Sequence, residues 1–238
     1  MLVTALGVLS LVLGTVIAWY ALRSLVVVPK LLRADVTPPA DIEPDNSFVV
    51  CRGTATATDD AVASPFTGTR CVGFEFAVSE RQPGPLPPWF VASIDDGVSS
   101  IPFRLSGQAG DIDVNPPSRR FSLDTNATVI KAGSNETPPK RTQQFVEKHD
   151  RLNPVAGWIS MIPGMGTRRY VERRIDPNEE YLIAGQTAQR NGKTELTGNL
   201  VITNKSLRQF VLSRLKRAAF PALVATFFVA VGGALLLV

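Results

Sequence analysis

Apolar residues are concentrated at the two ends of the chain. Residues 1–22 contain no charged residue, and neither do residues 218–238. A helix rises by about 1.5 Å per residue, so each segment is long enough to cross a hydrocarbon layer of roughly 30 Å. We therefore predict a transmembrane helix at each end. A cleaved secretory signal is the alternative for the first segment, but its start is uncharged and Trp19 and Tyr20 are bulky.

Between these segments, apolar and polar residues alternate with the period of β-strands. The clearest run extends from Val72 to Val78, in which every second residue is a valine or phenylalanine. Short runs of this kind, separated by turn residues, predict a mainly β domain, either a small barrel or a sandwich. The strands predicted are Phe48–Thr56, Cys71–Ser79, Ile101–Leu105, Asp111–Val114, Arg119–Leu123, Arg169–Ile175, Tyr181–Gln189 and Leu200–Thr203.

A short α insertion is predicted where the alternation stops, between residues 132 and 167. A polar helix is expected around Thr142–Leu152, followed by an apolar loop from Trp158 to Met165. We expect this loop to belong to the core, because apolar runs of this size are usually buried. Insertion into lipid or contact with a partner is the alternative.

The pattern divides the chain into five parts. Residues 1–22 and 218–238 are the spans, residues 23–46 a juxtamembrane stalk, residues 47–204 the β domain and residues 205–217 a basic helix. Ser206 and Gln209 have the spacing of a capping box that opens this helix. Its basic residues are expected at anionic lipid headgroups. The alternative is that they flank the span, as basic residues ordinarily do, without lipid specificity. They are Arg208, Arg214, Lys216 and Arg217.

Charge is distributed unevenly along the chain. All 21 acidic residues lie between Asp35 and Glu195, so the flanks carry +8 and the middle carries −4. Basic flanks suit a membrane surface, whereas an acidic domain argues against nucleic acid as a partner. Basic residues beside spans usually stay in the cytoplasm, which predicts a cytoplasmic domain with both termini outside. Three glycosylation sequons, at Asn126, Asn135 and Asn204, favour the opposite orientation.

Candidate catalytic and metal-binding chemistry is sparse. The single histidine, His149, is expected at the surface, while Cys51 and Cys71 could pair or remain buried thiols. The chain lacks nucleotide-binding and nucleophile motifs. We therefore predict no catalytic, cofactor-binding or metal-binding residue. Three acidic pairs are interpreted as solvated turns: Asp59-Asp60, Asp95-Asp96 and Glu179-Glu180.

A series of short segments occurs in a fixed order along the β domain. They are Gly53-Thr54-Ala55, Ser64-Pro65-Phe66-Thr67-Gly68-Thr69-Arg70-Cys71, Pro102-Phe103, Asp113-Val114, Tyr170-Val171-Glu172-Arg173-Arg174-Ile175, Tyr181-Leu182-Ile183-Ala184-Gly185 and Ile202-Thr203-Asn204-Lys205-Ser206. Over residues 48–238 this series resembles the GIDE or BAM (beside-a-membrane) domain family. The residues that the resemblance singles out as a structural or binding motif are Ser64, Pro65, Phe66, Gly68, Cys71, Glu172 and Gly185.

The resemblance implies a membrane-anchored domain with a binding, scaffold or sensing role. Its best-known members are RING-type E3 ligases of the MULAN/MAPL type, in which a RING follows the second span. A RING needs eight Cys or His ligands, and this chain has three such residues. The alternative function is a component of an E3 ubiquitin or ubiquitin-like transferase system in membrane or organelle organisation, with the RING supplied by another chain. The expected partners are the lipid bilayer and an unidentified protein; a homo-oligomer is left open.

The segment from Ser64 to Cys71 is expected to form a tight turn. Pro65 would fix φ, and Gly68 would permit a left-handed bend. This is a structural role, and contact of the turn with a ligand is the alternative. Arg70 or Cys71 would then belong to the contact.

Overall fold

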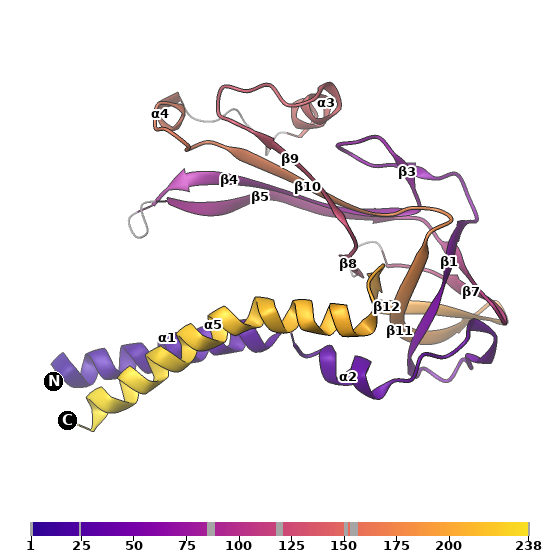
Figure 1. Cartoon of the computed structure of the whole chain (residues 1–238), viewed down its shortest axis with the longest axis horizontal. Helices are drawn as coiled ribbons and strands as arrows, with labels where there is room; N and C mark the ends of the chain where they lie inside the picture. The colour runs from indigo at the N-terminus through magenta and orange to yellow at the C-terminus, as the bar shows by residue number, and fades with distance from the viewer. Residues whose placement is uncertain are drawn as a thin grey trace. The chain divides into compact units, whose positions relative to one another are not determined.

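The computed structural model describes residues 2–23, 25–84, 89–117, 121–149, 152 and 157–237. The chain forms two compact units. Figure 1 shows the chain coloured by residue number. One unit consists of the terminal segments Met1–Asp35 and Lys205–Val238, and the other is the β domain Val36–Asn204. The beginning of the strand expected at Arg119 lies outside the described residues, as do two residues of the helix expected at Thr142–Leu152.

A closed five-stranded barrel forms one part of the β domain. Its strands are β1 (Phe48–Ala57), β6 (Phe103–Gly107), β7 (Gly110–Val114), β11 (Glu180–Arg190) and β12 (Lys193–Thr203). They follow the order β11-β1-β6-β7-β12, and β12 pairs again with β11 to close the barrel. Only β7 and β12 run parallel among these pairs. The prediction of a mainly β domain is confirmed, and the fold is a barrel.

A second, antiparallel sheet is built from the chain segments inserted between barrel strands. It has the order β5 (Trp89–Ser100), β4 (Gly73–Pro83), β10 (Arg168–Ile175) and β9 (Ala127–Ala132). Strand β8 (Phe121–Asp124) extends the barrel sheet by pairing in parallel with β12. A small ribbon joins β2 (Val62–Ala63) to β3 (Arg70–Cys71). Helices α3 (Lys140–Glu147) and α4 (Gly157–Ser160) lie between β9 and β10 in the chain, as Figure 1 shows.

Two separate cores hold these layers together. The barrel interior is filled by large side chains that are fully buried, among them Phe103, Leu105, Tyr181, Leu196 and Ile202. A smaller core under the second sheet contains Phe66, Val78, Ala132, Leu152 and Tyr170. Burial of such side chains is the main favourable term in folding. The sheet therefore has a core of its own.

The terminal unit is an antiparallel helix pair, α1 (Leu2–Arg23) and α5 (Leu207–Leu236), with the short helix α2 (Val28–Arg33) after α1. Small residues recur every seventh position along both contact faces, and these six residues are buried. They are Gly7, Gly14 and Ala21 on α1, and Ala218, Ala225 and Gly232 on α5. Small side chains let two helix backbones approach closely, as in membrane helix pairs.

Helix α5 begins as the sequence predicted. Ser206 accepts the N–H of Gln209 at 3.3 Å, and Gln209 accepts the N–H of Ser206 at 3.2 Å, which completes the capping box. The helix then continues through Pro221 to Leu236. Both α1 and α5 are long and apolar enough to cross a membrane.

Candidate functional site

The turn between β2 and β3 carries most of the motif residues. The N–H of Ser64 donates to the carbonyl of Thr69 at 3.0 Å, and the N–H of Gly68 donates back to Ser64 at 3.1 Å. Gly68 has φ +72°, so the expected left-handed bend is present. Thr67, Thr69 and Arg70 are exposed on this turn, whereas Ser64 is buried.

A buried carboxylate on β10 accepts hydrogen bonds from the turn. The side chain of Glu172 has no exposed surface. It accepts the backbone N–H of Phe66 at 2.8 Å and that of Thr67 at 3.2 Å. The Thr67 hydroxyl donates to the same carboxylate at 2.7 Å. Burial alone would raise the pKa of Glu172, but the hydrogen bonds from Thr67, Phe66 and Arg174 lower it.

Arg174 connects this carboxylate to a second one. Its Nη1 lies 2.9 Å from Glu172 Oε1, and its Nε lies 3.1 Å from Asp176 Oδ1. Residues two apart on a strand share a face, which explains why Glu172 and Arg174 meet. The N–H of Asp176 donates to the hydroxyl of Tyr181 at 2.8 Å, and that hydroxyl donates to Glu179 at 3.1 Å. The network therefore links the turn, the second sheet and barrel strand β11.

Phe66 fixes the turn from its apolar side. Its ring makes edge-to-face contacts with Phe76, Phe145 and Tyr170, with ring centroids 5.8, 5.2 and 5.4 Å away. The same residue therefore donates its N–H to Glu172 and places its side chain in the small core. The turn is anchored on both sides.

Both cysteines are buried free thiols. The thiol of Cys71 donates to the carbonyl of Val62 at 3.6 Å, and that of Cys51 donates to Ile183 at 3.6 Å. Burial raises the pKa of each to about 12. Neither is therefore a thiolate near neutral pH, and Cys71 acts as an apolar side chain at the base of the turn.

Gly185, the remaining motif residue, lies in the barrel wall on β11. It occupies a register shift between Ala184 and Gln186, and a Cβ at this position would collide with Leu200. Gly185 therefore allows close packing inside the barrel, away from the turn.

Sequence reasoning missed five participants in the network: Thr67, Arg174, Asp176, Glu179 and Tyr181. Four of them, together with Asn126, Asn204 and Thr125, border a small polar hollow of about 230 Å³. The spacing of Glu172, Arg174 and Asp176, at every second residue along β10 and just past its end, is the signal that could have indicated it. Their polar atoms bind one another, which leaves this cluster with a structural role.

Two sequence expectations about polar residues are wrong. His149 is half-buried and stacks on Phe145 with ring centroids 3.8 Å apart, instead of lying in solvent. Asp95 and Asp96 lie within β5 and pair with Val78 and Ala77, instead of forming a turn. Among the described residues, no group of three His, Cys, Asp or Glu side chains is arranged to hold a metal ion.

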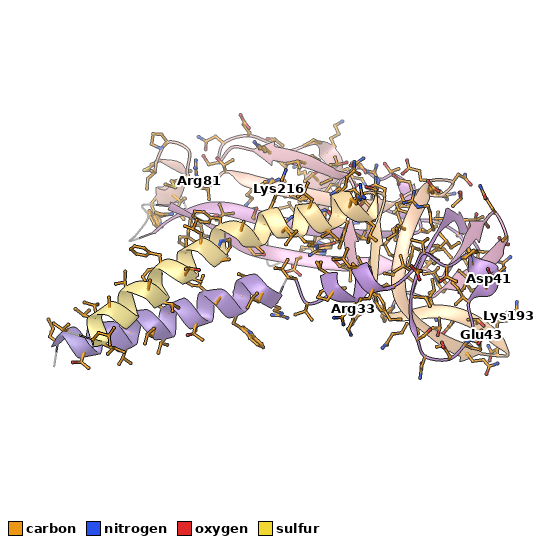
Figure 2. The ribbon with its side chains drawn as sticks, turned by 60° about the horizontal axis from the view of Figure 1, so that its bottom comes forward. Arg33, Asp41, Glu43, Arg81, Lys193 and Lys216 are labelled. Carbon is orange, nitrogen blue, oxygen red and sulfur yellow. The ribbon has the colours of Figure 1, made fainter. Side chains whose placement is uncertain are left out.

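The basic residues of α5 precede its uncharged segment. Arg208, Lys216 and Arg217 are exposed, and the guanidinium of Arg214 lies 4.9 Å from the centre of the Phe210 ring. Figure 2 shows Lys216 on this helix.

The fold and the site define a β-barrel protein with two apolar terminal helices and a carboxylate-anchored turn. Comparison of the chain with family models, curated proteins and solved structures finds no match.

Proposed function

We propose that the protein is a membrane-anchored, non-catalytic module that binds or scaffolds a protein partner beside the bilayer. The observation that carries this proposal is the paired apolar helices, which enter and leave one β domain. Their contact through glycine and alanine suits association in lipid, where apolar attraction between helices is weak. The basic residues Arg208, Lys216 and Arg217 would lie at the headgroups.

The chemistry of the turn supports a binding role over catalysis. The acidic and basic groups of its network are engaged with each other, and Glu172 is buried beneath the turn. A general acid or base must reach a substrate. By contrast, Thr69 and Arg70 are exposed on the turn, where a partner would have access to them. The transferase alternative depends on the family resemblance alone.

Binding of a protein partner at the turn is tested by photo-crosslinking in intact membranes. A photoreactive amino acid at Arg70 of the full chain is expected to give a discrete crosslinked product, identified by mass spectrometry. The same probe at exposed Gln108, in the β6–β7 turn, is the matched control. Equal labelling at both positions, or none at either, would remove the turn as the binding surface. A RING protein or conjugating enzyme as the product would favour the transferase alternative.

Orientation is tested through the three sequons. Asn126, Asn135 and Asn204 are all exposed, so each is open to glycosylation on an exported domain. We propose a cytoplasmic domain, which predicts no shift in mobility on treatment with a glycosidase. A shift that is lost in the Asn126→Gln variant would place the domain on the exported side.

A further inference from the structure

The end of the second sheet exposes a group of large apolar side chains, which we name the apolar tip. It consists of Trp158, Met161 and Ile162 from α4 and the following turn, and Phe90 and Val91 from β5. Met161 is 83% exposed, Val91 67% and Trp158 60%. The expectation that the loop Trp158–Met165 belongs to the core is wrong for Trp158, Met161 and Ile162, whereas it holds for Ile159 and Met165, which are buried.

Hydrogen bonds bring the two segments of the apolar tip together. The N–H of Arg81 donates to Thr167 at 3.0 Å, and the N–H of Gly166 donates to Arg81 at 2.8 Å. Arg81 also pairs with Val91 across β4 and β5. In Figure 1 the helix α4 lies beside the same end of β4 and β5. The segments that carry these exposed side chains therefore meet at the same end of the second sheet.

The charge around the apolar tip is the reverse of that of the domain. The domain is acidic overall, yet residues 81–94 and residues 151–171 contain no Asp or Glu. Arg81 and Arg169 are exposed there, while Arg168 is paired with the buried Glu80 at 2.8 Å. Figure 2 shows Arg81 at one end of the β domain and the acidic Asp41 and Glu43 at the opposite end.

Aromatic, methionine and arginine side chains, in chain segments that contain no Asp or Glu, suit the interface of an anionic bilayer. Because α1 and α5 hold the domain near a bilayer, lipid would be present at high effective concentration. We propose that the apolar tip docks into the headgroup region of anionic phospholipid, as a contact additional to the spans. This inference depends on the proposed membrane anchoring.

The test uses the full chain in vesicles of phosphatidylcholine and phosphatidylserine. An environment-sensitive fluorophore is attached at Met161→Cys, and the buried Cys51 and Cys71 are expected not to react. The matched control carries the fluorophore at Lys193→Cys, which is exposed at the end opposite Arg81 in Figure 2. Quenching by spin-labelled lipid is expected to be several-fold stronger at position 161 than at position 193.

A substitution and a change of lipid distinguish docking on the bilayer from contact with a second copy of the chain. Trp158→Ser should reduce quenching at position 161, and so should replacement of phosphatidylserine by phosphatidylcholine. Flotation of the vesicles tests membrane anchoring separately. A chain that fails to float with the vesicles would refute anchoring through α1 and α5, which is a different result from a failure of the apolar tip to dock. In vesicles that carry the protein, equal quenching at both positions would overturn the proposal. Protection of position 161 that depends on protein concentration would also overturn it and assign the tip to a second copy.

Discussion

The carboxylate of Glu172 accepts the backbone N–H of Phe66 at 2.8 Å, although 106 positions of the chain separate the two residues. This contact joins an interior strand of the second sheet to a turn that comes before the sheet in the chain. A buried charge is tolerated only when its hydrogen-bonding capacity is used, and here the turn and Arg174 use it. The turn and the carboxylate therefore depend on each other.

Replacing Glu172 should loosen the turn without unfolding the barrel. Glu172→Gln keeps the shape but removes the charge opposite Arg174, which should cost on the order of 3 kcal/mol locally. Amide exchange in the segment Ser64–Cys71, followed by mass spectrometry, should then accelerate about 100-fold. The exposed Glu43→Gln is the control and should leave exchange unchanged. Equal exchange in all three proteins would show that the carboxylate does not hold the turn.

The same carboxylate should make stability depend on pH in the acid range. Because its pKa is lowered in the folded protein, the unfolded chain binds the proton more readily. The stabilisation is therefore complete above the ordinary glutamate pKa of about 4.3 and is lost as pH falls towards the folded value. The difference in unfolding free energy between the natural chain and Glu172→Gln should shrink over that range. A difference that stays constant with pH would contradict a lowered pKa.

Local patterns predicted much of the β domain. Alternation identified the strands around Val72–Val78 and Arg169–Ile175, and the preference of glycine for positive φ identified the bend at Gly68. Strand β5 was missed because Asp95, Asp96 and Gly97 are typical of turns. Pairing with β4 along its length overrides that preference.

Contacts between distant segments could not be predicted in the same way. The sequence singled out Glu172 and Phe66 as motif residues, but their hydrogen bond depends on how the sheet folds back on the turn. The exposure of Trp158 was likewise not predictable, because an apolar run has the same composition on a surface as in a core. Both outcomes depend on tertiary packing.

The helix pair should be sensitive to size at Gly14. A Cβ there would lie 2.8 Å from Cγ2 of Val229 and 3.0 Å from its backbone N, so a larger side chain would force the helices apart. Gly14→Leu should destabilise the pair by about 1–3 kcal/mol. Unfolding in mixed micelles with increasing dodecyl sulfate, followed by Trp19 fluorescence, measures this change. Val12→Leu, on an exposed position of α1, should be nearly neutral, and equal effects of the two variants would refute the close packing.

The two cysteines should resist thiol reagents in the folded protein. Burial raises the pKa of Cys51 and Cys71 to about 12, so the reactive thiolate is scarce at every pH below about 10. A maleimide at neutral pH should modify neither residue until denaturant is added, whereas the exposed site in Met161→Cys should react at once. Peptide mapping identifies the modified residue. Modification of Cys71 in the folded chain would mean that the turn opens readily, and comparison with Glu172→Gln would then show whether the carboxylate controls that opening.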